Sequence, residues 1–119
     1  MKLLIVDDSL MMRKAIERGL AGKNFTIVGS AGDGEEGLRI FTETLPDLVT
    51  MDISMPKMDG IAALTEMLKI KKDAKIIMIT SQADNATAAE VLAKGAAGII
   101  VKPFSNEQIV KKVEEVIAG

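Results

Sequence analysis

Six polar side chains with the capacity for chemistry stand directly after short apolar runs of the sequence. They are Asp7 and Asp8 after LLIV, Asp52 after LVTM, Thr80 and Ser81 after IIMI, and Lys102 after IIV. Carboxylates are ligands for hard divalent cations such as Mg²⁺, and a carboxylate can also act as a nucleophile toward phosphorus. Hydroxyl and ammonium groups stabilise charge on phosphoryl oxygens. If these side chains come together, they form a metal-dependent site for phosphoryl chemistry.

The composition excludes several other kinds of site. The 119 residues contain no cysteine and no histidine, which excludes disulfides, zinc–thiolate centres and Ser-His or Cys-His catalysis. The net charge is −2, with basic and acidic residues interspersed, so neither nucleic acid nor an anionic membrane is an expected partner. No apolar run approaches the roughly 20 residues of a membrane span, and the N-terminus lacks the apolar segment of a signal peptide. We expect a cytoplasmic protein.

Five apolar runs alternate with amphipathic stretches along the chain. The continuous runs predict strands buried on both faces, at residues 3–6, 26–28, 48–51, 76–79 and 99–101. Apolar residues at helical spacing predict helices at residues 9–22, 34–44, 60–71, 84–94 and 105–118. Asp33 is expected to start the second helix and Ser105 the last, where Glu107 two residues later is close to a capping arrangement. No linker interrupts the pattern, so residues 1–119 are expected to form a single domain.

The alternation of strands and helices predicts an α/β domain with a parallel sheet and helices on both faces. Ligands of such open sheets bind beyond the carboxyl ends of the strands, so the six side chains are expected to share one crevice. Two carboxylates about 4 Å apart repel each other by on the order of 4 kcal/mol near a protein surface, a large part of a typical stability of roughly 5 to 15 kcal/mol. A cation must offset this repulsion, and Mg²⁺ suits a set of oxygen ligands.

Each of these residues also has an ordinary structural explanation, and only their conjunction favours a site. Asp8 or Ser9 could cap the first helix, and Lys102 before Pro103 could be a surface lysine. Within the site, Asp52 is the expected nucleophile because it stands alone on a central strand, whereas the neighbours Asp7 and Asp8 are better placed to hold the ion. Most methionines are expected in the core, with Met55 and Met58 as candidates for a binding surface. The expected core methionines are Met11, Met12, Met51, Met67 and Met78.

Four motifs resemble those of the receiver domain of bacterial two-component response regulators. They are VDDS at 6–9, MDISMPKMDG at 51–60, ITSQ at 79–82 and VKPF at 101–104. The resemblance covers the whole chain. It implies a flavodoxin-like, doubly wound sheet of five parallel strands in the order 2-1-3-4-5, with five helices.

The resemblance also implies a role for each site residue. Asp52 would accept a phosphoryl group from the phosphohistidine of a sensor histidine kinase. Mg²⁺ would be bound by Asp8, Asp52 and the main-chain carbonyl of Ser54, with Asp7 acting through a bound water. Thr80 and Lys102 would contact phosphoryl oxygens. Such a receiver catalyses its own phosphorylation and dephosphorylation, and it is a signalling protein rather than an enzyme.

Phosphorylation adds roughly −1.5 to −2 charges, which would pull Thr80 and Lys102 inward. The face formed by the fourth helix, fifth strand and fifth helix would then change and bind the output partner. The bond between Lys102 and Pro103 would be cis, and small Ser81 would leave the phosphate entry open. Many receivers have Tyr or Phe three residues before the lysine, but this chain has Ile99. The coupling to the output face is therefore expected to be altered or replaced by packing.

Several alternatives stay open at the level of sequence. The stretch DDSLMMRKAI resembles chemotaxis-type receivers, but the chain also fits a receiver excised from a longer transcription-regulating protein. The output partner is unknown, and the protein could be a monomer or a phosphorylation-dependent dimer. A Mg²⁺-dependent aspartyl-phosphate phosphohydrolase is the rival of another class, although its D-x-D motif is absent from the window Asp7, Asp8, Ser9. A toprim-like nuclease is disfavoured because no second acid follows Asp52 at the required spacing, and a pseudo-receiver is disfavoured by the intact acids.

Overall fold

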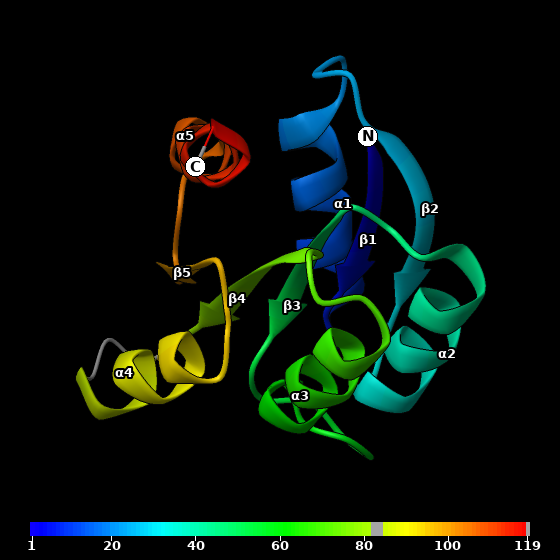
Figure 1. Ribbon diagram of the computed structural model, residues 1–119. Helices are drawn as coiled ribbons and strands as arrows, with labels where there is room; N and C mark the ends of the chain where they lie inside the picture. Colours follow the sequence, from blue (N-terminus) through cyan, green and yellow to red (C-terminus); the bar gives the residue numbers. More distant parts are fainter. Residues whose placement is uncertain (82–84, 119) are drawn as a thin grey trace.

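The structure is a computed structural model that describes residues 1–81 and 85–118. Strands and helices alternate along the chain (Figure 1). The strands are β1 (Lys2–Val6), β2 (Thr26–Ala31), β3 (Leu48–Asp52), β4 (Lys75–Thr80) and β5 (Gly98–Val101). The helices are α1 (Leu10–Leu20), α2 (Gly34–Thr44), α3 (Gly60–Ile70), α4 (Asn85–Ala93) and α5 (Asn106–Ala118). Gln82 of the third motif and Asp84, the expected start of the fourth helix, lie outside the described residues.

The strands form one parallel sheet in the order β2-β1-β3-β4-β5. Helices α1 and α5 cover one face of this sheet, and α2, α3 and α4 cover the other (Figure 1). The predicted strand order and flavodoxin-like architecture are therefore confirmed. All carboxyl ends lie at one edge because every strand is parallel to its neighbours.

Two apolar cores hold the helices to the sheet. Leu4 and Val6 of β1 pack toward α2, α3 and α4, whereas Leu3 and Ile5 pack toward α1 and α5. The strands β1, β3 and β4 are buried on both faces almost throughout, as predicted. The same prediction is wrong for β2, which begins with two exposed residues and extends to Ala31. As an edge strand, β2 has a neighbour on one side only.

Local hydrogen bonds explain where two of the helices begin. The Oγ atom of Ser9 accepts from the main-chain N–H of Met12 at 3.2 Å, so Ser9 caps α1. At α5, Ser105 Oγ accepts from the N–H of Gln108 at 3.1 Å, and Gln108 Oε1 accepts from the N–H of Ser105 at 2.7 Å. This reciprocal pair is a capping box, which requires a spacing of three residues. Ser105 therefore starts α5 as expected, and its partner is Gln108 rather than Glu107, which lacks the required spacing.

Most methionines lie in the core, as predicted. Met51, Met67 and Met78 are fully buried, and Met12, Met55 and Met58 pack half-buried against the cores. Met55 and Met58 therefore support the packing of their loop as well as contributing to the surface. Met11 is 83% exposed, so its expected place in the core was wrong. It lies on the outer face of α1, whose buried face is formed around Ile16 and Leu20.

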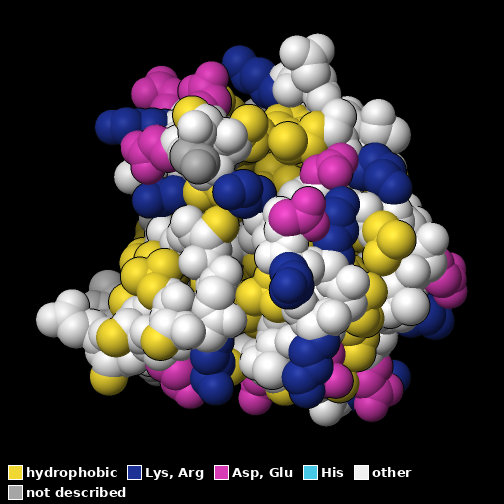
Figure 2. Space-filling model, in the orientation of Figure 1, with side chains coloured by type: hydrophobic (Ala, Val, Ile, Leu, Met, Phe, Trp, Pro, Cys, Tyr) yellow, Lys and Arg dark blue, Asp and Glu magenta, His cyan; other side chains and the backbone are white. Residues whose placement is uncertain are grey.

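The surface of the described residues shows no separation of charge on the side seen in Figure 2, where basic and acidic side chains are interspersed. Within residues 1–81 and 85–118, no helix is both long enough and apolar enough to cross a membrane.

Thr50 is a buried polar residue in the middle of β3, and it yields a stability prediction. It lies between Ile5 of β1 and Ile77 of β4, and its hydroxyl has no hydrogen-bond partner among the described residues. A buried hydroxyl left without a partner costs about 1 to 3 kcal/mol. The isosteric change Thr50→Val should therefore raise the free energy of unfolding by about 1 kcal/mol. Urea denaturation followed by circular dichroism measures this, since the chain has no Trp or Tyr.

Thr50→Ser is the matched control, because it keeps the hydroxyl and removes only the methyl group. This variant should be less stable than the wild type. A Thr50→Val protein less stable than the wild type would show that the hydroxyl is satisfied in solution.

Candidate functional site

The ends of β1 and β3 bring the three predicted carboxylates together. Asp7 follows β1 directly, and Asp52 is the last residue of β3. Val6 is paired with Met51 in the parallel register, so the residues that follow emerge side by side. One carboxylate oxygen each from Asp7, Asp8 and Asp52 lies within 4.8 Å of the others. Asp7 is fully buried, Asp52 is 6% exposed and Asp8 is exposed.

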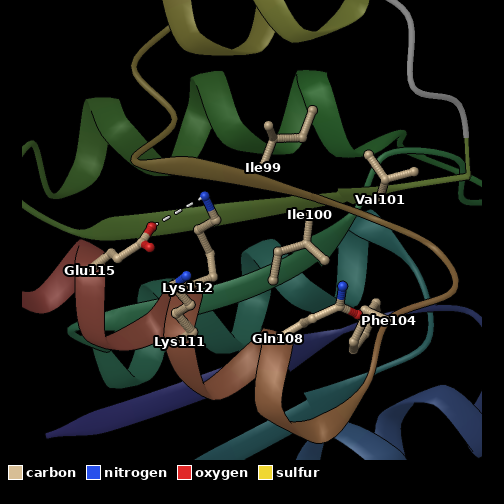
Figure 3. A pocket seen from close by; sticks show the side chains of 8 residues that line it. All are labelled: Ile99, Ile100, Val101, Phe104, Gln108, Lys111, Lys112 and Glu115. Atoms are coloured by element: carbon tan, nitrogen blue, oxygen red, sulfur yellow. Dashed lines mark ion pairs between the residues drawn. The ribbon is translucent and has the colours of Figure 1, made fainter.

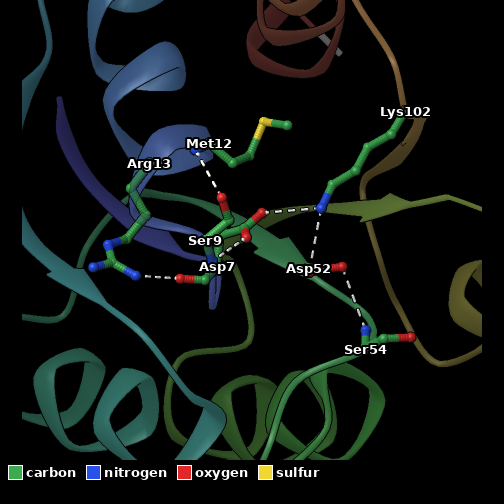
Figure 4. Close-up of polar contacts among 7 residues, drawn as sticks. All are labelled: Asp7, Ser9, Met12, Arg13, Asp52, Ser54 and Lys102. Atoms are coloured by element: carbon green, nitrogen blue, oxygen red, sulfur yellow. Dashed lines mark hydrogen bonds and ion pairs between the residues drawn. The ribbon is translucent and has the colours of Figure 1, made fainter.

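Lys102, which follows the edge strand β5, bridges two of these carboxylates at the same end of the sheet (Figure 4). Its Nζ lies 3.3 Å from Oδ2 of Asp7 and 3.3 Å from Oδ2 of Asp52. Its main-chain N–H donates to the carbonyl of Thr80 at 2.7 Å. The bond to Pro103 is cis, as the resemblance implies. The lysine side chain therefore reaches past β4 to the end of β3.

The loop between β3 and α3 is held tightly against the end of β3. The N–H of Ile53 donates to the carbonyl of Ile79 at 2.9 Å, and the N–H of Gly60 donates to the carbonyl of Ile53 at 2.8 Å. A Cβ atom on residue 60 would lie 2.2 Å from the carbonyl oxygen of Asp52, so this approach requires glycine. The N–H of Ser54 donates to Oδ1 of Asp52 at 3.4 Å (Figure 4). The main chain of Ser54 thus lies beside the candidate nucleophile.

The same loop also packs on the N-terminus of α2. Asp33 caps that helix, as expected, and pairs with Lys57 at 3.8 Å. A Cβ atom on Gly34 would lie 2.0 Å from the carbonyl oxygen of Met58. The loop that carries Ser54 is therefore held by hydrogen bonds at both of its ends and by contact with the start of α2.

Asp7 is fixed by its main chain as well as by its carboxylate. Its N–H donates to the carbonyl of Ala31 at 3.0 Å, and its Oδ1 accepts from the N–H of Ser9 at 2.9 Å. Its carbonyl accepts from Nη1 of Arg13 at 2.5 Å (Figure 4). Sequence reasoning did not single out Arg13. Its acceptor is a main-chain carbonyl, which residue types do not reveal.

Burial and charge perturb both partners of the Lys102 ion pairs. Burial and the neighbouring Asp7 raise the pKa of Asp52, although Lys102 opposes them. Burial lowers the pKa of Lys102, but Asp7 and Asp52 outweigh it, so the net pKa is raised. Lys102 therefore stays protonated, and it offsets the repulsion between the two carboxylates only in part.

The donor atoms of this site fit Mg²⁺. Oδ2 of Asp7 is buried and accepts no aligned hydrogen bond among the described residues, although Lys102 faces it at 3.3 Å. Such an oxygen retains capacity for a cation or an ordered water. The three acids of the cluster offer carboxylate oxygens, the ligands that Mg²⁺ prefers over nitrogen or sulfur.

The other predicted residues lie at neighbouring strand ends. Thr80 is the last residue of β4 and is almost buried, whereas Ser81 is exposed. Ile99 lies on β5 and packs half-buried against the core under α2, α3 and α4. Pro103 is exposed. The structure thus joins the three carboxylates and Lys102 in one cluster, with Thr80 at the end of the strand between β3 and β5.

A doubly wound parallel sheet with an acid cluster and a lysine at its carboxyl edge defines a receiver-type domain. The sequence model of the response regulator receiver domain matches residues 3–114, and the chain belongs to this family. It is therefore a CheY-like receiver of two-component signalling.

Relatives and solved structures agree with this assignment. The chemotaxis protein CheY of Listeria monocytogenes is 36% identical over 115 residues, which cover 97% of each chain. The CheY of Thermotoga maritima is 37% identical over 97% of this chain and 96% of its own. The structure of a CheX–CheY–BeF3–Mg²⁺ complex from Borrelia burgdorferi matches with a TM-score of 0.94 and 36% identity, covering 98% of this chain and 88% of that chain.

The repulsion within the acid cluster predicts stabilisation by Mg²⁺. A saturating concentration, about 100 times the dissociation constant, should add roughly 2.7 kcal/mol to the free energy of unfolding. The melting temperature measured by circular dichroism should rise accordingly, and Asp8→Ala should abolish the rise. Asp73→Ala, which removes an exposed acid elsewhere, should keep it. A wild-type protein that melts at the same temperature with and without Mg²⁺, at matched ionic strength, would refute the ion site.

The raised pKa of Asp52 predicts a pH-dependent effect in the metal-free protein. A carboxyl whose pKa is raised by folding contributes stability at low pH, and this contribution is lost as the pH rises through the folded pKa. In the presence of EDTA, Asp52→Asn should therefore melt a few degrees higher than the wild type at pH 7. The difference should shrink as the pH falls toward the ordinary aspartate value of about 3.9.

Asp73→Asn is the control for this comparison, because the same change is made at an exposed position. It should leave the melting temperature nearly unchanged at both pH values. If Asp52→Asn were less stable than the wild type at pH 7, the ion pair with Lys102 would outweigh burial and the charge of Asp7.

Proposed function

We propose that this protein is a phosphorylation-dependent switch in which Asp52 accepts a phosphoryl group from a histidine kinase. The observation that carries the proposal is the position of Lys102, whose ammonium group lies 3.3 Å from both Asp7 and Asp52 within the acid cluster. A positive charge placed beside a buried carboxylate at a sheet edge suits the transfer of a negatively charged group to that carboxylate.

In the proposed reaction, a carboxylate oxygen of Asp52 attacks the phosphorus of phosphohistidine. An O–P bond forms, the P–N bond breaks, and the imidazole nitrogen keeps the electron pair and takes up a proton. Lys102 then pairs with one phosphoryl oxygen, and the hydroxyl of Thr80 donates to another. Asp8, Asp52 and the carbonyl of Ser54 would hold Mg²⁺, with Asp7 acting through a water, and the ion would supply positive charge that offsets the carboxylates and the phosphoryl oxygens. Water later attacks phosphorus, which releases phosphate and restores the carboxylate.

The domain provides both half-reactions with its own residues, so we regard it as a self-modifying signalling protein rather than an enzyme. The phosphoryl group adds roughly −1.5 to −2 charges and new acceptor oxygens. Lys102 would leave Asp7 and Asp52 and would turn, together with Thr80, toward the phosphoryl oxygens. Since Lys102 follows β5 directly, its movement would be transmitted to this strand.

The proposed output surface is the face made by α4, β5 and α5. Figure 3 shows a hollow on this face between β5 and α5, with Ile99, Val101 and Phe104 among the side chains that line it. Ile99 occupies the place where an aromatic residue is common in related receivers. Because Ile99 packs against the core, we propose that a shift of β5 changes the shape of the hollow through packing rather than through rotation of a ring.

The proposed partners are a sensor histidine kinase and an output protein of a chemotaxis-type pathway. Relatives described as chemotaxis protein CheY support this choice, and so does a neighbouring structure in which CheY is bound to CheX, BeF3 and Mg²⁺. The alternative, an output domain that regulates transcription, is supported by a relative described as a probable transcriptional regulator, of which this chain covers 45%.

Phosphoramidate is a suitable donor for the test because its P–N bond resembles that of phosphohistidine. Incubation with phosphoramidate and Mg²⁺ should add one phosphoryl group, detected by intact-mass measurement. Asp52→Asn should add none, because it removes the nucleophile, and EDTA should suppress the reaction in the wild type. Lys102→Met should slow it by about 10²-fold or more, since one stabilising charge is lost.

Asp73→Asn is the matched control and should be phosphorylated like the wild type. An adduct that persists in Asp52→Asn would overturn the assignment of the nucleophile. Continuous release of phosphate at enzymatic turnover rates would instead favour the phosphohydrolase alternative.

A further inference from the structure

Arg13 contacts the acid cluster at its main chain rather than at a carboxylate. Its Nη1 atom donates to the carbonyl oxygen of Asp7 at 2.5 Å (Figure 4). This carbonyl belongs to the peptide group that joins Asp7 to Asp8. The guanidinium therefore restrains the link between the buried acid and the exposed one.

The charge of Arg13 has opposing electrostatic effects, because it offsets part of the repulsion among the carboxylates but is disfavoured by the helix dipole and by a bound cation. Arg13 lies near the N-terminus of α1, where the helix dipole disfavours positive charge. It also stands beside a cluster that fits a divalent cation, which it would repel. Since the contact is made with a main-chain carbonyl, it restrains the backbone as well as placing a charge. The guanidinium also lies close to Gly32, where a Cβ atom would be 3.3 Å from Nη1.

Asp8 depends on this restraint more than Asp7 does. The N–H of Asp7 is bound to Ala31, and its two carboxylate oxygens face Ser9 and Lys102. The carboxylate of Asp8 is exposed, and within the described part of the chain it makes no hydrogen bond or ion pair. Its direction is therefore set by its main chain, which begins at the peptide group that Arg13 holds.

We propose that Arg13 is a positioning residue for the metal site, which it serves by fixing the peptide between Asp7 and Asp8. This inference rests on the proposed binding of Mg²⁺. For the change in Mg²⁺ affinity on replacing Arg13, it predicts the opposite sign to the one expected from charge alone. Loss of the arginine removes a repelling charge, yet it should weaken the binding of Mg²⁺ because Asp8 loses its orientation.

The test is titration of the metal-free protein with Mg²⁺ by calorimetry. Arg13→Met keeps the length of the side chain and its helix propensity but removes both charge and donor. It should raise the dissociation constant about tenfold, as expected when a group that orients a ligand is lost. Arg13→Lys restores a donor and should recover most of the affinity. Arg18→Met, an exposed arginine in the last turn of the same helix, should bind Mg²⁺ like the wild type.

A second measurement needs no metal. In nuclear magnetic resonance spectra of the protein in EDTA, the amide signals of Asp8 and Ser9 should shift in Arg13→Met and stay in place in Arg18→Met. Unchanged amide signals would overturn the inference, and so would Mg²⁺ binding in Arg13→Met that is as tight as in the wild type or tighter. A lower melting temperature with unchanged affinity would assign Arg13 a structural role only. A wild-type protein that binds no Mg²⁺ would overturn the proposed ion site as well.

Discussion

At the carboxyl edge of this sheet, like charges are held together by the backbone. Val6 and Met51 are paired in adjacent parallel strands, and Asp7 and Asp52 follow them directly. The register that buries the two apolar residues therefore also brings the carboxylates of Asp7 and Asp52 close together. At an effective dielectric constant of about 20, two unit charges 4 Å apart repel by about 4 kcal/mol. Lys102 offsets part of this energy. The remaining imbalance makes the site receptive to a divalent cation and to a change in its charge.

Two close main-chain approaches hold this arrangement in place. Gly60 allows the start of α3 to lie against the carbonyl of Asp52, and Gly34 allows the start of α2 to lie against the carbonyl of Met58. Both contacts immobilise the loop that carries Ser54. A ligand set made of short loops can act on a cation only if the loops do not move away under repulsion.

Strand β5 links the acid cluster to the proposed output face. Lys102 follows this strand directly and spans β4 to reach Asp52, so a new negative group on Asp52 would act on the end of an edge strand. Ile99 and Phe104 near that strand line the hollow beside α5. As an edge strand, β5 is hydrogen-bonded to one neighbour only. Membership of the receiver family gives this arrangement its biological setting.

The sequence by itself determined the strand order through the family motifs, the core of the central strands, and the cluster formed by Asp7, Asp8, Asp52 and Lys102. Continuous apolar runs and polar residues at strand ends are local signals, and the parallel topology converts them into one site. Only the tertiary structure decided the exposure of β2 and of Met11, because burial depends on neighbours that periodicity does not specify. It also decided the contact of Arg13 with the carbonyl of Asp7, since a main-chain acceptor leaves no trace in residue types.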